Sequence, residues 1–241
     1  MQTTPAPLSA TTAVRTGGGQ EYRARAQQIL EQVGLVGFES LLRWRHPERG
    51  LLLPEAFISL AEDTGLLVPI GWWALEEACR QARHWRDAAR ERNGGPPPYV
   101  TVNLSATQLS QPDLIEQLAG ALERTGTAPE SIRLELTETV VMQHAEATMR
   151  TLDRLRELRV PLMIDDFGMG YSSLSYLHRF AADTLKIDGS FIAGIGPDGE
   201  NSEIVRTIVA LADELGMEVV AEGVETADQF RMVRILGCRS A

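Results

Sequence analysis

Cysteine and histidine are scarce in this chain. Two cysteines, Cys79 and Cys238, and four histidines occur among its 241 residues. The cysteines lie far apart and the histidines do not cluster, which excludes a disulfide framework and a zinc signature. We interpret both cysteines as buried free thiols.

Long apolar runs and an excess of positive charge are also missing. No stretch approaches the roughly 20 apolar residues that a membrane helix requires, so we expect no membrane segment and a cytoplasmic protein. The 33 acidic and 23 basic side chains give a formal net charge of −10. This charge disfavours duplex nucleic acid, which proteins bind through a broad basic face. A small anionic ligand is compatible, since divalent cations reverse the local field of a carboxylate-lined pocket.

The first 33 residues differ in pattern from the rest. Residues 1–19 are rich in Thr, Ala, Pro and Gly and lack the basic and apolar regions of a signal peptide. Residues 20–32 have the pattern of a short helix that a turn at Gly34 ends. We therefore predict a flexible leader and short helix over residues 1–33 and one domain over residues 34–241.

Strand-like apolar runs alternate with amphipathic helical patterns over the rest of the chain. The strand-like runs are residues 37–43, 99–103, 132–138, 160–166, 184–188 and 218–222. Helices are expected near residues 54–63, 70–92, 111–125, 144–158, 171–180, 200–215 and 226–236, with the tryptophans of 70–92 in the core. This alternation and the chain length predict an α/β fold of the TIM-like (β/α)8 barrel type. The carboxyl ends of barrel strands meet at one mouth, so we expect an active site there.

Each strand-like run ends in or near a group suited to holding a metal ion or a phosphate. These groups are the carboxylates of Glu39, Glu135, Asp165, Asp166 and Glu222, the amide of Asn103 and the amine of Lys186. Carboxylate and amide oxygens without His or Cys favour Mg²⁺ or Mn²⁺ over zinc. Arg43 at the mouth could bind a phosphate through its guanidinium fork.

Ordinary structural roles are the alternative for single members of this set. Neighbours such as Asp165 and Asp166 point to opposite faces of an extended strand, and an Asp pair before glycines is often a turn signal. We expect Gly168 and Gly170 to allow the turn that brings both carboxylates to the mouth. Lys186 and Glu222 could form a structural ion pair, but a lysine inside an apolar strand needs carboxylates or phosphate around it. Six compatible strand ends favour a common site.

Several sequence blocks together resemble the EAL domain of bacterial cyclic-di-GMP phosphodiesterases. The blocks are FESLLRWRHPERG (38–50), VNLSATQL (102–109), LELTET (134–139), IDDFGMGYSSLSYL (164–177), LKID (185–188) and AEGVET (221–226). The resemblance extends from about Gly37 to Ala241. It implies a barrel with a two-metal site that hydrolyses cyclic-di-GMP to linear pGpG in bacterial second-messenger signalling. An unrelated metal-dependent lyase or isomerase would also use acidic strand ends, but the blocks at 102–109 and 164–177 argue against it.

The resemblance assigns two Mg²⁺ or Mn²⁺ ions to this chain. It makes Glu39, Asn103, Glu135 and Asp165 metal ligands, with Asp165 bridging the ions and Asp166 serving the second one.

The same resemblance assigns roles to five further residues. Lys186 would hold or polarise the attacking water, and Glu222 would orient that water or act as the base. Glu138 would anchor the loop that runs from Asp166 to Ser173. Leu41 and Arg43 would contact the dinucleotide.

The chain departs from the family pattern at its ends and at two positions. Ser40 stands where the family usually has Ala, and Met169 where it commonly has Thr or Ala. The Tyr-Gln-Pro strand before the first glutamate and the Gln-Gly-Tyr strand after Gly237 are not found, so we expect an incomplete barrel. The alternative function is therefore a catalytically silent EAL module that binds cyclic-di-GMP or a protein partner. The resemblance also suggests a homodimer, and a sensor or GGDEF domain upstream in a longer parent protein.

Overall fold

The computed structural model describes residues 36–91, 96–142, 145–168, 177, 179–180, 182–196, 200–238 and 240–241. The chain divides into two compact units. Unit 1 comprises the chain up to Phe38, Thr137–Met142 and Leu162–Ala241, and unit 2 comprises Glu39–Leu136 and Gln143–Pro161. The leader and helix predicted for residues 1–33, and most of the helix predicted for 171–180, lie outside the described residues.

Parallel strands form the centre of unit 2. Strand β4 (Tyr99–Asn103) pairs with β5 (Ile132–Thr137), with Val100 beside Ile132 and Asn103 beside Glu135. Strand β1 (Gly37–Ser40) is the neighbour of β4 on its other side. Val100, Val102, Ile132, Leu134 and Leu136 are buried, as expected of strands whose β-branched and leucine side chains pack under helices. The β4–β5 pairing therefore ends at Asn103 and Glu135.

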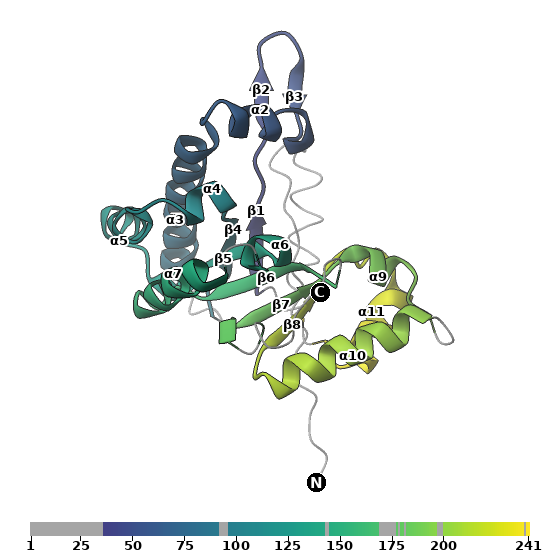
Figure 1. The fold of residues 1–241 in the computed structure, drawn as a ribbon. Helices are drawn as coiled ribbons and strands as arrows, with labels where there is room; N and C mark the ends of the chain where they lie inside the picture. The colour runs from purple at the N-terminus through teal and green to yellow at the C-terminus, as the bar shows by residue number, and fades with distance from the viewer. Residues whose placement is uncertain are drawn as a thin grey trace. The chain divides into compact units, whose positions relative to one another are not determined.

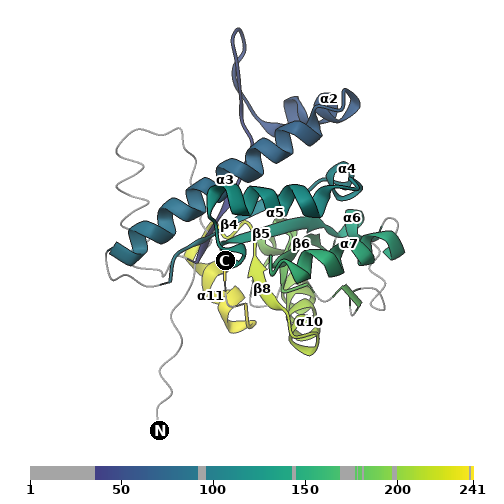
Figure 2. The ribbon, with the colours of Figure 1, turned by 90° about the vertical axis from the view of Figure 1, so that its left-hand side faces the viewer.

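The longest helix of unit 2 is α3 (Leu67–Glu91), and it packs on β4 and on α5 (Leu114–Thr125). Its buried residues recur at helical spacing, at Leu67, Gly71, Ala74, Leu75, Ala78, Cys79 and Ala82. Figure 2 shows α3 lying alongside α5. The expectation that the tryptophans of this helix are core residues is wrong for Trp73, which is 59% exposed.

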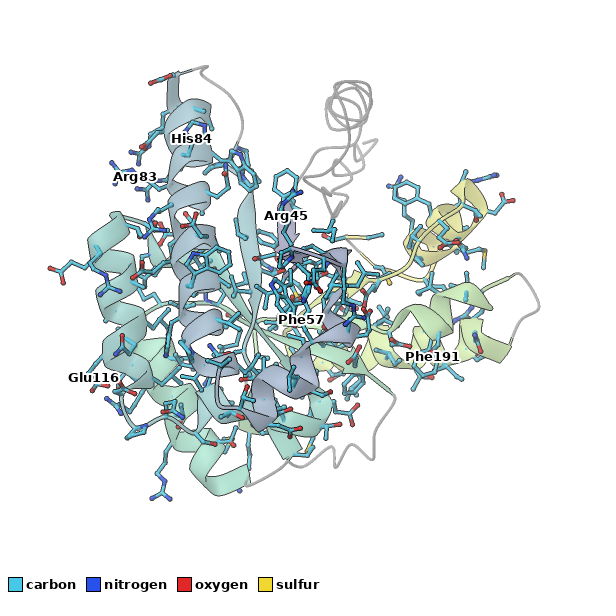
Figure 3. The ribbon with its side chains drawn as sticks, turned by 90° about the horizontal axis from the view of Figure 1, so that it is seen from above. Arg45, Phe57, Arg83, His84, Glu116 and Phe191 are labelled. Atoms are coloured by element: carbon cyan, nitrogen blue, oxygen red, sulfur yellow. The ribbon has the colours of Figure 1, made fainter. Side chains whose placement is uncertain are left out.

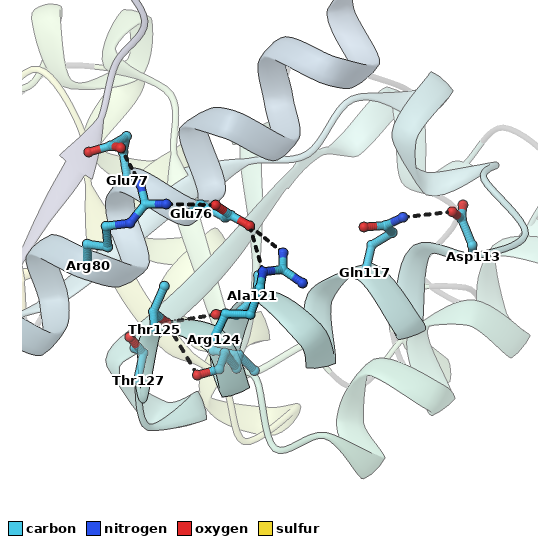
Figure 4. Close-up of polar contacts among 10 residues, drawn as sticks. Glu76, Glu77, Arg80, Asp113, Gln117, Ala121, Arg124, Thr125 and Thr127 are labelled. Atoms are coloured by element: carbon cyan, nitrogen blue, oxygen red, sulfur yellow. Dashed lines mark hydrogen bonds and ion pairs between the residues drawn. The ribbon is translucent and has the colours of Figure 1, made fainter.

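Hydrogen bonds and ion pairs join α3 to α5 where the two helices pack (Figure 4). Glu76 on α3 accepts from Arg80 of the same helix and from Arg124 of α5, and the bond from Arg124 lowers the pKa of Glu76. Thr127, just after α5, donates from its hydroxyl to the Cys79 carbonyl at 2.8 Å. Arg83, labelled in Figure 3, donates to the Gly126 carbonyl at the carboxyl end of α5.

The other helical segments of unit 2 are short or flank this pair. They are η1 (Pro54–Ala56), α2 (Ile58–Asp63), α4 (Ala106–Leu109), η2 (Pro129–Ser131) and α7 (Ala145–Glu157). Helix α7 packs on α5, where Arg154 pairs with Glu116 at 2.9 Å. Helix α4 begins with a capping box in which Ser105 and Gln108 satisfy each other's backbone amides.

A β-hairpin follows β1 that the sequence analysis did not predict. The predicted strand 37–43 ends at Ser40, and β2 (Trp44–His46) then pairs antiparallel with β3 (Gly50–Leu52). Within the turn, His46 Nδ1 accepts from the amides of Glu48 and Arg49, each at 3.1 Å. The Trp44 ring packs edge-on against His46 and Phe57. Pro47 and Gly50 favour a turn at this place in the sequence, but they do not by themselves show that the segments on either side pair.

Unit 1 contains three parallel strands in the order β6-β7-β8, seen side by side in Figure 1. They are β6 (Leu162–Phe167), β7 (Thr184–Ile187) and β8 (Glu218–Ala221). Helix α10 (Glu200–Glu214) connects β7 to β8 and packs on both strands. The shorter helices are α6 (Glu138–Met142), α9 (Gly189–Ala193) and α11 (Ala227–Ile235). Strand and helix thus alternate as the sequence pattern predicted.

The free side of β8 carries one further bridge. Ser240 pairs in parallel with Val220, and its carbonyl accepts from the Ala221 amide at 3.0 Å. We expected the last barrel strand to be missing on this side of β8, and in the structure Ser240 pairs at that position. No helix among the described residues combines the length and the apolar character that crossing a membrane requires.

The start of α11 depends on one side chain, Thr226. Its hydroxyl accepts from the Gln229 amide at 3.1 Å, while Gln229 Oε1 accepts from the Thr226 amide at 2.9 Å. We expect Thr226→Ala to lower the free energy of unfolding by about 1 kcal/mol, because the amide of Gln229 loses its partner. Urea denaturation measures this loss, and Thr226→Ser, which keeps the hydroxyl, serves as the control. Equal stability of the alanine variant and the wild type would contradict the role of the cap.

Both thiols are predicted to be unreactive in the native protein. Burial raises the pKa of Cys79 to about 11 and that of Cys238 to about 12. Reaction requires the thiolate, so a disulfide reagent at pH 8 should release no chromophore from the folded protein and two equivalents after unfolding in guanidinium. Rapid reaction of either native thiol would show that its helix or turn opens readily.

Candidate metal centre

Lys186 occupies the middle of strand β7 and is 5% exposed. Its neighbours Leu185 and Ile187 are fully buried. The ammonium Nζ lies 3.3 Å from Asp165 Oδ1 on β6 and 3.6 Å from Glu222 Oε2, one residue beyond β8. Two carboxylates from the neighbouring strands therefore offset the cost of burying this charge. We had expected that a lysine in an apolar strand needs carboxylates or phosphate around it.

Asp165 and Asp166 lie at an irregularity of β6. Ile164 is in register with Leu185, whereas Phe167 is in register with Ile187, so β6 has one extra residue between these pairs. Asp166 has a positive φ of 54°, which is uncommon outside glycine, and its amide donates to Asp165 Oδ1 at 2.9 Å. Such a bulge changes the direction of a side chain. We had expected Gly168 and Gly170 to allow the change of direction. In the structure Asp166 itself adopts the unusual backbone conformation.

The bulge produces an acidic cluster at the carboxyl ends of the unit 1 strands. One ligand oxygen each from Asp165, Asp166 and Glu222 lie within 4.8 Å of one another. Asp165 is buried, and the other two side chains are partly exposed. Three carboxylates this close repel one another unless cations lie between them, and Lys186 supplies one positive charge. The cluster could also hold a divalent metal ion.

Glu138 connects the first residue of α6 to the segment after β6. It is 2% exposed, and its Oε2 accepts from the Gly168 amide at 3.0 Å. Gly168 has a φ of 101°, and a Cβ at this position would lie 2.8 Å from the Phe191 ring. Glycine is therefore needed here. This contact falls within the loop that the resemblance assigns to residues 166–173, of which residues 169–173 lie outside the described part of the chain.

The predicted ligands of unit 2 also lie at strand ends. Asn103 Nδ2 donates to Glu39 Oε1 at 3.4 Å, which joins the ends of β1 and β4. Asn103 is beside Glu135 in the β4–β5 register, and the Leu104 amide donates to the Glu135 carbonyl at 2.8 Å. Glu135 is 2% exposed. Unit 2 thus has a group of oxygen donors of its own.

Leu41 and Arg43 lie in the irregular segment between β1 and β2. The Leu41 side chain is 42% exposed. Arg43 is half-buried, and its Nη1 donates to the Leu42 carbonyl at 2.6 Å. The remaining donors of the guanidinium fork can still bind an anionic ligand.

The donor chemistry of both groups suits Mg²⁺ or Mn²⁺. The side chains present carboxylate and amide oxygens, which hard divalent cations prefer, and histidine and cysteine ligands are absent from both groups.

One acidic residue at the same edge was not assigned a role from the sequence. Asp188 follows β7 and accepts from the Ser190 amide at 2.9 Å, which caps α9. The hydrogen bond from Ser190 lowers the pKa of Asp188.

Parallel strands with flanking helices and oxygen ligands at their carboxyl ends define an α/β domain of the TIM-barrel type. The chain belongs to the EAL domain family, whose sequence model matches residues 20–241. The resemblance inferred from the sequence blocks is thereby confirmed.

Curated relatives support this assignment. The chain is 45% identical over 207 residues to the bifunctional diguanylate cyclase/cyclic di-GMP phosphodiesterase MucR of Pseudomonas aeruginosa, covering 86% of this chain and 29% of MucR. It is 44% identical over 200 residues to the cyclic di-GMP phosphodiesterase NbdA of the same organism, covering 83% of this chain and 25% of NbdA. The chain thus spans less than a third of either relative.

Solved structures share the fold. The structure named PaMucR Phosphodiesterase, c-di-GMP complex, matches with a TM-score of 0.79 and 44% identity, covering 85% of this chain and 81% of that one. The cAMP and cyclic-di-GMP bound form of the EAL enzyme Bd1971 matches with a TM-score of 0.81 and 32% identity, covering 87% and 56%. These matches confirm the predicted fold class.

We predict that the ion pairs of Lys186 contribute strongly to the stability of the metal-free protein. Lys186→Met leaves Asp165 and Glu222 without their cation, and loss of one partner of a buried pair costs about 3 kcal/mol. Urea denaturation in the presence of a chelator measures this cost.

The matched control is Arg231→Met, which removes an exposed cation paired with Asp228 in the same unit. Exposed pairs contribute at most about 1 kcal/mol, so this variant should remain close to the wild type. Similar losses in the two variants would show that burial of Lys186 does not matter.

Proposed function

We propose that this domain is a metal-dependent phosphodiesterase that hydrolyses cyclic-di-GMP to linear pGpG. Family membership and two curated relatives named as cyclic di-GMP phosphodiesterases support the reaction class. Two of the similar structures were solved with cyclic-di-GMP bound. The observation that carries the proposal is the buried Lys186 between Asp165 and Glu222.

The metal-binding role falls to oxygen donors at the strand ends. Two Mg²⁺ or Mn²⁺ ions would be held by Glu39, Asn103, Glu135 and Asp165, with Asp165 shared between the ions and Asp166 serving the second one. When bound, such a pair of ions lowers the pKa of a water and neutralises charge on the phosphate. The bulge at Asp165 and Asp166 supports the assignment, because it gives adjacent residues of one strand oxygens close enough to serve neighbouring ions.

Lys186 and Glu222 act on the attacking water in this proposal. The Lys186 ammonium has three donors, and its carboxylate partners fix its position, so it can hold the water by a hydrogen bond. Glu222 is only partly buried, with 41% of its side chain exposed. Its carboxylate can therefore orient the water, accept its proton and pass that proton to solvent.

Substrate contacts are assigned to Leu41 and Arg43 in the segment after β1. The exposed Leu41 side chain offers an apolar surface to a guanine base, and Arg43 offers a cation to a phosphate oxygen. Glu138 anchors the residue that follows β6 by accepting a hydrogen bond from the Gly168 amide. In the longer parent protein we propose an upstream sensor or cyclase domain as partner, and a homodimer of this domain.

The test is hydrolysis of cyclic-di-GMP by the purified protein with Mg²⁺ or Mn²⁺, following pGpG by chromatography. We expect Glu222→Gln to lower kcat by at least about 100-fold, because the base is lost. Glu218→Gln is the matched control, since Glu218 is exposed at the opposite end of the same strand. The Glu218→Gln variant should retain wild-type activity. A chelator should abolish turnover by the wild type and by the Glu218→Gln variant.

Two outcomes would count against the proposal. Equal activity of the Glu222→Gln and Glu218→Gln variants would remove Glu222 from the mechanism. Binding of cyclic-di-GMP in calorimetry without any product would instead establish the catalytically silent module.

A further inference from the structure

Unit 2 has a polar layer directly below its predicted metal ligands. Thr101 is beside Arg133 in the β4–β5 register, and Asn103 is beside Glu135. Side chains two residues apart on a strand share a face. Arg133 therefore lies on the same face as Glu135, while Ile132, Leu134 and Leu136 are buried on the other face.

Arg133 is held in place by an aromatic ring. Its guanidinium carbon lies 3.8 Å from the centroid of the Tyr99 ring, a cation–π contact that favours the charged side chain over the ring face. Arginine remains protonated at any ordinary pH. Arg133 is only partly exposed, so its fixed positive charge is incompletely screened by solvent.

Two carboxylates lie on or beside this face. Glu135 is almost completely buried, and Glu39 lies at the end of β1 within reach of Asn103. Burying a carboxylate is costly unless a cation is near. Glu135 and Arg133 are one pleat repeat apart on β5, roughly 7 Å between their Cα atoms. Coulomb interactions over such distances are appreciable in a partly buried site.

We propose that Arg133 is a positioning residue for the metal ligands of unit 2. Its fixed positive charge stabilises the Glu135 and Glu39 carboxylates when no metal is bound, and it thereby weakens metal binding to a level that allows exchange. The proposal rests on the metal-binding role assigned to Glu135 in the proposed function. It does not depend on contact between substrate and Arg133.

Calorimetric titration with Mn²⁺ tests the proposal on the purified protein. We expect Arg133→Met to bind Mn²⁺ about three- to tenfold more tightly, because a cation no longer repels the ion across roughly 10 Å. Arg133→Lys, which keeps the charge, should bind like the wild type. Tyr99→Leu removes the ring contact but no charge, so it should lower stability without tightening Mn²⁺ binding.

A surface control separates a local effect from a change of net charge. Arg154→Met removes one cation from α7 in the same unit, where Arg154 and its partner Glu116 are exposed. Salt screens this distant charge, so Mn²⁺ affinity should not change. Tightening equal to that of Arg133→Met would overturn the proposal.

Thermal unfolding gives a readout that a merely structural role would not produce. Without its internal cation, the Arg133→Met protein should lose more stability in a chelator than in saturating Mn²⁺. The rise in Tm on adding Mn²⁺ should therefore exceed that of the wild type. Equal losses with and without metal would assign Arg133 to packing alone and overturn the proposal.

The outcomes distinguish this proposal from the proposed function. Absence of Mn²⁺ binding by the wild type would overturn the metal site and the role of Arg133 together. Wild-type binding with an unchanged affinity in Arg133→Met would overturn only the role of Arg133. If Arg133→Met and Arg133→Gln fail to fold while Arg133→Lys folds, the requirement for the charge is supported. Failure of all three would indicate a packing role.

Discussion

The ion pairs of one buried lysine organise the candidate site of unit 1. Lys186 is the sole lysine in a chain whose other basic residues are all arginines. Its ammonium requires oxygen partners because it lies inside an apolar strand. Asp165 and Glu222 provide them from the strands on either side. A guanidinium is planar and larger than an ammonium and presents its donors in a rigid fork, so lysine and arginine are not interchangeable at this position.

Gathering the carboxylates around that lysine involves local backbone strain. Asp166 adopts a left-handed conformation and β6 contains a bulge, both within one strand. Such features persist where the surroundings hold them, and they occur often at functional sites. Here the surroundings include the fully buried side chains of β7 and the contact between Glu138 and the Gly168 amide. The core therefore maintains an arrangement that isolated strands would not adopt.

Unit 2 balances its charges differently. Its oxygen donors lie at or near the ends of β1, β4 and β5, and an arginine held over a tyrosine ring shares the face of Glu135 on β5. In both units a carboxylate that could bind a metal has a basic side chain of the same sheet close by. Such compensation lets the apoprotein fold before a metal arrives, since paired carboxylates cost less to bury.

The sequence by itself determined the class of fold and the family. Alternating apolar runs predicted parallel strands and helices, and the blocks around Glu39, Asp165 and Glu222 identified the EAL domain, because periodicity and motif spacing are local properties of the chain. It also indicated that Lys186 needed carboxylates. Only the tertiary structure decided which carboxylates those are, and that Asp166 itself changes direction at a bulge. The hairpin at Trp44–His46, the exposure of Trp73 and the contact of Arg133 with Tyr99 were likewise decided there. The hairpin is a local pairing that depends on register, and the other features depend on strand register or helix packing between residues that are distant in the sequence.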